Sequence, residues 1–375
     1  MRVLFWSELF WPYMGGAQLV AMNLLLGLRE RGHEFIVVTR QDDPDLPAED
    51  HFQGFPIHRF PFYSALAERD LSQLITIRRQ VAQLKERFAP DLIHINCFGM
   101  SILFHLDTVK AHPAPLLLTL QSEKYPPPGE HDTVLERTLR SADWITAPSA
   151  KTVEYARQLL PDIELPASHI YNGLATPSVV PTPLPFDVPR LLCLGRLAPN
   201  KGIDLALIAL AAVIEHVPQV RLVIAGDGPA RSELEQKTVE LGLSDVVDFV
   251  GWVAMEQVPE LINTATVVVV PSREWEALPL VALEAAFMAR PVVAARDAGL
   301  PEAVLHEETG LLVETEDSAG LAQALIFLLE NPKKAIQLGQ AARQRALDVF
   351  SLQRFIDSYE ALYVKLEEQN STAPE

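Results

Sequence analysis

Short apolar strands alternate with helical segments in this chain, and this restricts the folds open to it more than any other feature. Near the N-terminus, a strand at residues 3–6 leads into the turn Gly15-Gly16, a helix with apolar positions through Leu28, and a strand at residues 35–39. Strand, helix and strand in this order form one β-α-β unit, whose two strands lie parallel. Its repetition predicts an α/β protein built on doubly wound parallel sheets.

The alternation occurs in two blocks. In the first block, further strands are predicted at residues 57–60, 92–95, 116–120 and 144–147. In the second block, strands are predicted at residues 191–195, 221–225, 247–250, 267–270 and 291–294, and helices at residues 203–216, from residue 230, and at residues 258–263. We therefore expect two Rossmann-like domains, residues 1–176 and residues 191–351, that face each other across a central cleft.

A run of prolines separates the two blocks. The prolines are Pro177, Pro181, Pro183, Pro185 and Pro189. Proline has no N–H and clashes inside a helix, so this segment is neither a helix interior nor a central strand. We interpret residues 177–190 as the linker between the domains. The tail at residues 352–369 has a helical pattern.

The composition describes a globular chain of two ordinary domains, with 375 residues, 49% of them hydrophobic and 21% charged. The net charge of −18 argues against nucleic acid or a strongly anionic membrane as the main partner, because both repel an acidic surface. An anionic ligand would therefore need a few well-placed cations.

Several features favour a cytoplasmic location. The first residues contain one basic side chain and only a four-residue apolar run before Ser7, too short for a signal peptide. The longest uncharged apolar stretch, residues 205–214, is well below the roughly 18 residues of a spanning helix. Cys97 and Cys193 lie in apolar runs, where free thiols are favoured over a disulfide. Peripheral contact at the inner membrane face stays open.

Residues 267–302 carry the pattern with the clearest chemistry. An apolar strand is followed by Glu276 in a loop, then Pro279, then Glu284 within a predicted helix. Proline suits the first position of a helix, because its missing N–H would have no partner there. The amides from Leu280 onward then point outward at the positive end of the helix, where a diphosphate can bind.

Seven residues separate the two glutamates, and this setting resembles the E-x7-E signature of family 4 of the retaining GT-B glycosyltransferases, the glycosyl transferases of group 1. The resemblance continues through EAAFMARPVVAARDAGLPEAV, where Ala289 and Ala298 stand at positions that are commonly glycine. It implies a GT-B fold and a metal-independent hexosyltransferase that uses a nucleoside diphosphate sugar as substrate and no cofactor. It also implies that residues 1–176 bind the acceptor, that residues 191–351 bind the donor, and that residues 352–369 pack back on the first domain.

A second motif lies after the first strand of the second domain. Gly195 to Gly202 matches the family's G-R-L-x-x-x-K-G pattern, with Arg196 and Lys201 at the edge where parallel sheets bind ligands. Both side chains are charged at neutral pH and can stabilise the departing nucleoside diphosphate. In the first domain, Gly16 matches a family glycine that lets backbone approach phosphate.

The resemblance assigns roles to the acids. Glu284 would accept hydrogen bonds from the ribose hydroxyls and Glu276 would contact the donor sugar. The implied donor-binding set is Gly16, Arg196, Lys201, Glu276, Leu278, Pro279, Leu280 and Glu284. The implied catalytic residues are Glu276, Arg196 and Lys201, in a front-side substitution in which the leaving phosphate helps to deprotonate the acceptor.

Gln121 departs from the family, whose members commonly have a histidine there that contacts the donor sugar. Glutamine keeps hydrogen-bonding capacity but does not titrate. His94 ends a predicted strand, and either a structural histidine or an acceptor contact fits it. We expect the loop at residues 121–131 to help choose the acceptor.

Other charged residues give weaker indications of function. Asp43-Pro44-Asp45 imitates a D-x-D metal motif, but in a polar loop it indicates solvated carboxylates, so we infer no metal site. The helix at residues 77–88 carries four basic residues, for which a solvated face is favoured over membrane contact. They are Arg78, Arg79, Lys85 and Arg87.

Two alternative functions stay open beside sugar transfer. One is a sugar-nucleotide 2-epimerase of related fold, which would need acid–base residues around the sugar. The other is a catalytically silent nucleotide-sugar-binding protein, suggested by Gln121. The identities of the base, sugar and acceptor are open as well.

Overall fold

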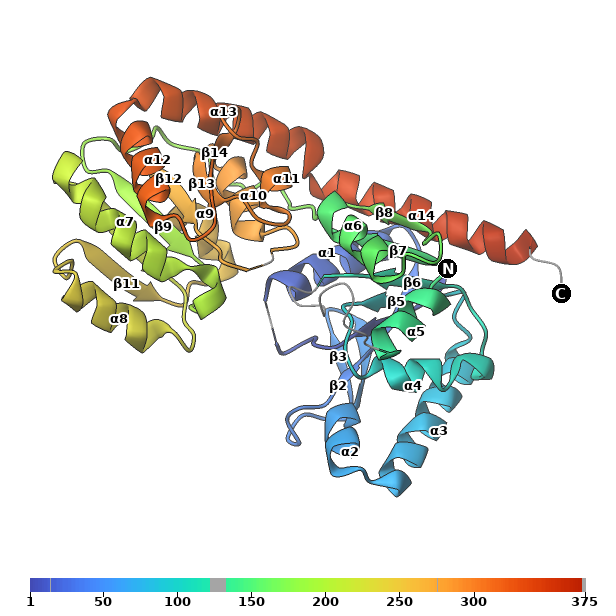
Figure 1. Ribbon diagram of the computed structural model, residues 1–375. Helices are drawn as coiled ribbons and strands as arrows, with labels where there is room; N and C mark the ends of the chain where they lie inside the picture. Colours follow the sequence, from blue (N-terminus) through green and yellow to red (C-terminus); the bar gives the residue numbers. More distant parts are fainter. Residues whose placement is uncertain (14, 122–132, 275, 373–375) are drawn as a thin grey trace. The chain divides into compact units, whose positions relative to one another are not determined.

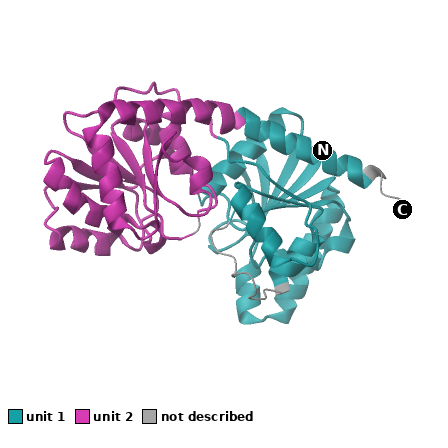
Figure 2. Cartoon of the chain, turned by 45° about the horizontal axis from the view of Figure 1, so that its top comes forward, with its two compact units in different colours: residues 1–173, 353–375 teal, residues 174–352 magenta. Residues whose placement is uncertain are grey.

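The computed structural model describes residues 1–13, 15–121, 133–274 and 276–372 (Figure 1). The chain forms two compact units, coloured separately in Figure 2. Unit 1 comprises Met1–Gly173 and Gln353–Glu375, and unit 2 comprises Leu174–Leu352. Unit 2 is therefore inserted in the sequence of unit 1.

An eight-stranded sheet forms the centre of unit 1. Its strands are β1 (Arg2–Ser7), β2 (Glu34–Arg40), β3 (Glu49–Phe52), β4 (Phe55–Phe60), β5 (Leu92–Asn96), β6 (Leu116–Thr119), β7 (Trp144–Ala147) and β8 (Ala167–His169). They follow the order β3-β4-β2-β1-β5-β6-β7-β8, and all neighbours are parallel except β3 and β4. Sheets of this kind are covered on both faces, which explains why β1 reads as a continuous apolar run.

Helices connect these strands. They are α1 (Gly16–Glu30), α2 (Phe62–Glu68), α3 (Leu71–Phe88), α4 (Ile102–Leu106), α5 (Thr133–Ser141) and α6 (Ala150–Leu159), with α14 (Leu352–Thr372) at the C-terminal end. Asp70 begins α3, because its carboxylate accepts hydrogen bonds from the amides of Ser72 and Gln73. Such a cap satisfies two amides that the helix itself leaves without partners.

The helix α14 packs on unit 1 through two tyrosines. The hydroxyl of Tyr363 lies 2.6 Å from Nδ1 of His94, and that of Tyr359 lies 3.3 Å from Oγ1 of Thr119. Both tyrosines are buried. Arg31, which follows α1, adds ion pairs to two carboxylates of α14. The last helix of the chain therefore completes the core of the first unit.

Unit 2 contains a six-stranded parallel sheet. Its strands are β9 (Arg190–Leu194), β10 (Arg221–Ala225), β11 (Val247–Gly251), β12 (Val267–Val270), β13 (Val292–Ala295) and β14 (Gly310–Val313), in the order β11-β10-β9-β12-β13-β14. Its helices are α7 (Ile203–His216), α8 (Arg231–Glu240), α9 (Val258–Asn263), α10 (Leu280–Phe287), α11 (Leu300–Ala303), α12 (Ser318–Glu330) and α13 (Pro332–Val349). The prediction of two Rossmann-like α/β domains with parallel sheets is confirmed.

The proline-rich segment at residues 177–190 is held on unit 2. Arg290, only 1% exposed, donates to the carbonyl oxygen of Thr182 at 2.8 Å and to that of Asn263 at 2.6 Å. The Asn263 side chain in turn accepts a hydrogen bond from the Thr182 amide at 2.9 Å. Burial lowers the pKa of Arg290 to about 10. This part of the segment is thus fixed to the second unit by buried hydrogen bonds.

The basic residues of α3 do not share one face. Lys85 is fully buried, with Nζ 3.2 Å from Nδ1 of His105, and burial lowers its pKa to about 7. Arg78 forms an ion pair of 2.6 Å with Asp107. The prediction of a solvent- or membrane-facing Lys85 is therefore wrong, since its stem fills the core between α3 and α4.

Both cysteines are free, Cys97 in unit 1 and Cys193 in unit 2. Among the described residues, no helix combines the length and apolar character that crossing a membrane requires. Peripheral membrane contact stays a prediction.

Candidate functional site

The turns after β9 and β12 lie together at one edge of the unit 2 sheet. These two strands are neighbours, but the chain continues from β9 to one side of the sheet and from β12 to the other. The strand order reverses between them, and open α/β sheets bind ligands at this point, beyond the carboxyl ends of the strands. Residues 195–202 follow β9 and residues 271–279 follow β12. The topology therefore brings the two sequence motifs to one place.

Gly202 allows the two turns to touch. Its φ is 63°, and a Cβ atom there would lie 2.0 Å from the carbonyl oxygen of Pro271. Any other residue would thus collide with backbone, as well as adopt a left-handed conformation that favours glycine. The amide of Arg273 donates to the carbonyl of Asn200 at 2.8 Å, which joins the turns by backbone as well.

Glu276 and Lys201 form an ion pair across these turns. The Lys201 Nζ lies 2.7 Å from Oε1 of Glu276, and the Ser272 hydroxyl donates to the same oxygen at 2.9 Å. The Glu276 residue is only 6% exposed, whereas the Lys201 side chain is 24% exposed. A buried carboxylate needs such partners to stay ionised. The pair therefore holds an ammonium group at the open edge of the sheet.

A second ion pair clamps the same turns. Arg273 donates two hydrogen bonds to the Asp204 carboxylate at the start of α7, one from Nη2 at 2.7 Å, and a third to Glu316. Burial opposes ionisation of Asp204, but the hydrogen bonds from Arg273 lower its pKa. The sequence analysis missed this clamp. Its members belong to no motif, and only the strand order brings α7 beside the turn after β12.

The helix α10 begins beside the ion pair. Pro279 has extended backbone (φ −70°, ψ 124°) and precedes the first helical residue, Leu280, so it lies one position earlier than predicted. No side chain among the described residues caps this helix. Leu278 is buried, and Gly299 donates its amide to the carbonyl of Glu276 at 2.8 Å. The start of α10 is therefore held in place by apolar packing and backbone contacts, leaving its positive end available to an anion.

Glu284 and Arg196 complete the predicted donor set in unit 2. Glu284 lies in the second turn of α10, partly buried, and desolvation raises its pKa to about 7. Within the described part of the chain, its carboxylate has no hydrogen-bond or ion-pair partner. Arg196 is exposed in the turn after β9. A half-titrated carboxyl group and an exposed cation are suited to a polar ligand, and their roles stay predictions.

Gly16 and Gln121 lie in unit 1. Gly16 is the exposed first residue of α1, directly after the turn that follows β1. Gln121 is half-buried, two residues beyond the end of β6. Both are at the carboxyl edge of their sheet, where ligands of parallel sheets bind. The rest of the predicted acceptor loop, residues 122–131, lies outside the described residues.

His94 lies within the core of unit 1. It is fully buried on β5, with Nε2 2.7 Å from Oγ1 of Thr119 and Nδ1 bonded to Tyr363. Burial lowers its pKa to about 3, so the ring is neutral. Of the two alternatives for His94, this geometry corresponds to the structural histidine. A surface contact with an acceptor is contradicted, because the α14 tyrosine covers the ring.

Glu8, which follows β1, was also missed. It is 9% exposed, and its Oε1 accepts hydrogen bonds from the amide and hydroxyl of Ser101 at 3.1 and 2.6 Å. Its other oxygen is buried and has no partner within the described residues. Burial raises the pKa of Glu8. Glu8 lies directly after the end of β1, and the strand order of unit 1 reverses between β1 and β5. Open α/β sheets bind ligands at such a point.

Asp43 and Asp45 form a local turn. The Asp43 carboxylate accepts a hydrogen bond from the Asp45 amide at 2.9 Å. In the part of the chain that the structure describes, no group of three or more histidine, cysteine, aspartate or glutamate residues is placed to hold a metal ion.

Two family models match consecutive parts of the chain. Glycosyltransferase Family 4 matches residues 14–176, and Glycosyl transferases group 1 matches residues 181–345. The chain belongs to the family 4 glycosyltransferases. The predicted resemblance, made from the E-x7-E and G-R-L-x-x-x-K-G motifs, is confirmed by these matches.

Several family 4 relatives are similar in sequence. A GDP-mannose-dependent alpha-(1-6)-phosphatidylinositol monomannoside mannosyltransferase of Mycolicibacterium smegmatis is 33% identical, over 58% of this chain and 60% of that protein. A D-inositol 3-phosphate glycosyltransferase of Saccharomonospora viridis is 38% identical, over 48% of this chain and 43% of that protein. The matches thus span about half the length of these relatives.

Solved structures of glycosyltransferases share the fold along the chain. Sucrose-phosphate synthase from Thermosynechococcus elongatus has a TM-score of 0.82 at 25% identity, covering 97% of this chain and 98% of that chain. Anabaena Alr3699/HepE in complex with UDP has a TM-score of 0.80 at 22% identity, covering 97% and 100%. The GT-B fold expected of a family 4 glycosyltransferase is therefore confirmed.

Proposed function

We propose that this chain transfers a sugar from a nucleoside diphosphate sugar to an acceptor hydroxyl, with retention of configuration at the transferred carbon. The observation that carries the proposal is the Lys201–Glu276 ion pair at the reversal point of the unit 2 sheet. It combines a cation for phosphate with an acid for sugar hydroxyls, beside a helix start that suits an anion.

Charge explains why the diphosphate would bind here. The chain as a whole has a net charge of −18, so an anionic ligand requires local cations. Arg196 is exposed in the turn after β9, and Lys201 extends from the same turn. These two cations and the partial charge of the amides at the start of α10 exceed the single negative charge of Glu276, so these groups together are positive. This compensation also lowers the barrier, because negative charge develops on the leaving diphosphate.

The reaction then requires few protein groups. The bond between the sugar's anomeric carbon and the diphosphate oxygen breaks, and the acceptor oxygen bonds to the same face of that carbon. The acceptor proton moves to a leaving phosphate oxygen. Glu276 would orient the sugar, and Glu284 would hold the ribose diol by two accepted hydrogen bonds.

The relatives' names support transfer and not epimerisation. They include a mannosyltransferase, an inositol phosphate glycosyltransferase and a sucrose-phosphate synthase. One relative is named GDP-mannose-dependent and one neighbour was solved with UDP, so both donor classes should be tested. We take the transferred sugar to be a hexose and the acceptor to be a glycan, a glycolipid or a small alcohol. A cytoplasmic location, with peripheral membrane contact, would suit the glycolipid case.

We further propose that the reaction needs no metal ion. Arg196 and Lys201 would supply the charge that a divalent ion gives to a diphosphate elsewhere. Activity in excess EDTA should equal activity in magnesium. A strict requirement for the metal would refute this part of the proposal and leave sugar transfer intact.

The test uses GDP-mannose and UDP-glucose, incubated with the full chain, with and without a panel of acceptor alcohols. Release of nucleoside diphosphate, and a product anomer that matches the donor's, are expected. Calorimetry with the same donors separates the second candidate, which Gln121 favours. A silent binder would give heat of binding but no release with any acceptor. If the donors gave no heat of binding and no nucleoside diphosphate were released, both candidate functions would be refuted.

A further inference from the structure

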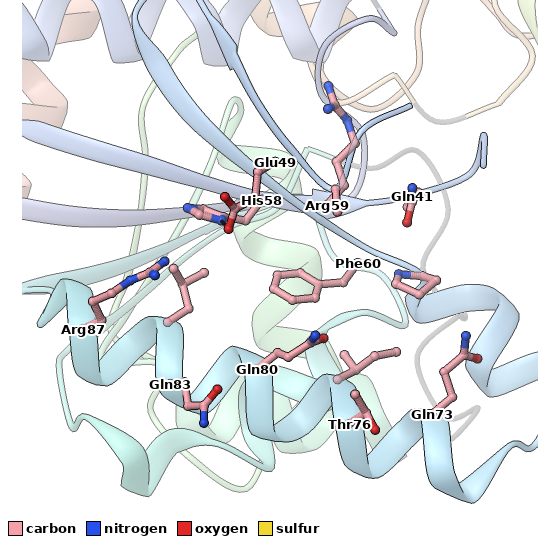
Figure 3. A pocket seen from close by; sticks show the side chains of 14 residues that line it. Gln41, Glu49, His58, Arg59, Phe60, Gln73, Thr76, Gln80, Gln83 and Arg87 are labelled. Atoms are coloured by element: carbon pink, nitrogen blue, oxygen red, sulfur yellow. Dashed lines mark ion pairs between the residues drawn. The ribbon is translucent and has the colours of Figure 1, made fainter. Parts of the chain in front are cut away.

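A pocket of about 500 Å³ lies in unit 1 between α3 and the hairpin of β3 and β4 (Figure 3). This volume is typical of sites for small molecules, which range over about 300–1,000 Å³. None of the residues assigned to the donor lines it, since the Lys201–Glu276 site belongs to unit 2. The pocket is therefore formed by residues that the proposed donor site does not use.

One face of α3 supplies a row of uncharged polar side chains to this pocket. Gln73, Thr76, Gln80 and Gln83 follow the i, i+3, i+4 spacing that places residues on the same side of a helix. In Figure 3 they follow the helix below the strand that carries His58 and Phe60. These two strand residues are two positions apart and so face the same side of the sheet.

The amides of this row have hydrogen-bonding capacity to spare. The Oε1 atom of Gln73 is buried without a partner within the described residues. Gln80 and Gln83 are exposed, and their side chains have no hydrogen bond to the described part of the chain, so a ligand need displace only water from them. A buried amide oxygen without a partner costs about 1–3 kcal/mol, so a ligand that donates to it would be stabilised. Each carboxamide both donates and accepts, as a sugar hydroxyl does.

The charged groups of the pocket nearly cancel. Oε1 of Glu49 lies 3.6 Å from Nδ1 of His58, and Arg87 contributes one cation close enough to His58 to act on its pKa. Burial lowers the pKa of His58, which leaves its ring mostly neutral near pH 7. Arg59 is engaged with Asp50 at 3.0 Å. One carboxylate and one guanidinium give no net attraction for a phosphate or sulfate group.

We infer that this pocket of unit 1 binds a neutral sugar unit. Amide groups on the helix bond its hydroxyls, and the largely buried ring of Phe60 offers an apolar surface to its carbon face. The inference does not depend on the proposed function, because neither Gly16 nor the donor-binding residues of unit 2 line this pocket. Its failure and the failure of sugar transfer are therefore distinguishable.

The experiment measures saturation-transfer NMR of the full chain with glucose, mannose and maltose, and with glucose 6-phosphate as a charged comparator. The double variant Gln73→Ala/Gln80→Ala removes two amides of the pocket. The matched control, Gln337→Ala/Gln340→Ala, removes two amides from the exposed face of α13. Thr76→Trp is a third variant, which fills the pocket without removing an amide.

The neutral sugars should give saturation-transfer signals with the unmodified chain and equally with the control variant. Both pocket variants should weaken binding by at least about tenfold, which corresponds to about 1.4 kcal/mol. Thermal stabilisation by UDP or GDP should be unchanged in every variant, which also verifies folding. The inference would be overturned if the Thr76→Trp variant bound the neutral sugars as well as the unmodified chain does, if glucose 6-phosphate alone gave signals, or if no neutral sugar gave a signal.

Discussion

The Nζ atom of Lys201 lies 2.7 Å from Oε1 of Glu276, although 74 residues separate them in the sequence. Each belongs to a turn that follows a parallel strand, and the two strands are neighbours where the strand order reverses. The ion pair is therefore a product of topology. Lys201 and the Ser272 hydroxyl both stabilise this buried carboxylate.

Replacing Lys201 with methionine should destabilise the fold by about 2 kcal/mol, because the buried Glu276 carboxylate would lose this ion pair. Denaturant unfolding measures this change. Lys333→Met, on the exposed surface of α13, is the control and should have little effect. The double variant Lys201→Met/Glu276→Gln should recover part of the loss. Additive losses would show that the two side chains are not energetically coupled.

Arg196→Ala and Glu276→Ala should each reduce turnover by about 10²-fold or more, because both are proposed to act on the transition state. Release of nucleoside diphosphate at saturating donor is the measurement. Arg354→Ala removes an exposed guanidinium of α14 and should leave turnover unchanged. Near-normal rates for both site variants would contradict the assignment.

Donor binding should depend on the protonation of Glu284, whose pKa is raised to about 7. Only the ionised carboxylate accepts two hydrogen bonds from a ribose diol, so donor affinity should fall as the pH decreases below about 7. Titration calorimetry with UDP-glucose or GDP-mannose suits this test, because their phosphates stay ionised over the range. Glu284→Gln should bind more weakly at pH 8 and lose the pH dependence. An unchanged profile in this variant would exclude Glu284 as its source.

The same substitution should stabilise the fold at alkaline pH. The unfolded carboxyl ionises near pH 4.5, whereas the folded one keeps its proton up to about pH 7. Stability therefore falls as the pH rises between these values and stays lowered above them. Glu284→Gln removes this loss, so at pH 8 it should raise the free energy of unfolding by at most about 3 kcal/mol. Thermal melts of the variant and the unmodified chain at pH 4.5 and pH 8 measure this difference. A higher melting temperature of the variant at pH 4.5 alone would contradict the prediction.

Ala289→Gly and Ala298→Gly should each raise stability by about 0.5–1 kcal/mol. Both alanines have left-handed backbone, with φ of 54° and 43°, which costs a residue with a Cβ atom about 1–2 kcal/mol. Part of this gain is offset by the greater freedom of glycine in the unfolded chain. Chemical denaturation measures the change, and Ala324→Gly within the helix α12 is a control that should destabilise. Left-handed backbone at both positions agrees with the glycine that the family resemblance leads us to expect there.

Regular elements were the most predictable part of the fold. The helices at residues 203–216 and 258–263 begin and end as α7 and α9 do, because apolar periodicity and flanking glycine or proline mark their ends. The strand β3 was not predicted. Its residues alternate between exposed and partly exposed, with none buried, so the strand has no apolar pattern. It depends on the turn Gln53-Gly54, whose positive φ values of 51° and 84° suit a hairpin.

Side-chain partners were less predictable, because they depend on which elements become neighbours. The motifs placed Arg196, Lys201 and Glu276 on the turns where the structure has them. No local pattern indicated that Arg273 would bond Asp204, or that Lys85 would lie in the core against His105. His94 was equally ambiguous, because its burial depends on a tyrosine 269 residues away.

The position of α14 has a consequence for dissecting the protein. A fragment that stopped at Gly173 would lack the two tyrosines of α14 that contact His94 and Thr119. These two polar side chains of the first sheet would then lose their partners, and the apolar core around them would be exposed to water. Separate production of this half thus calls for a grafted or co-expressed copy of Leu352–Thr372, whereas Leu174–Leu352 is continuous and can be expressed as a single piece.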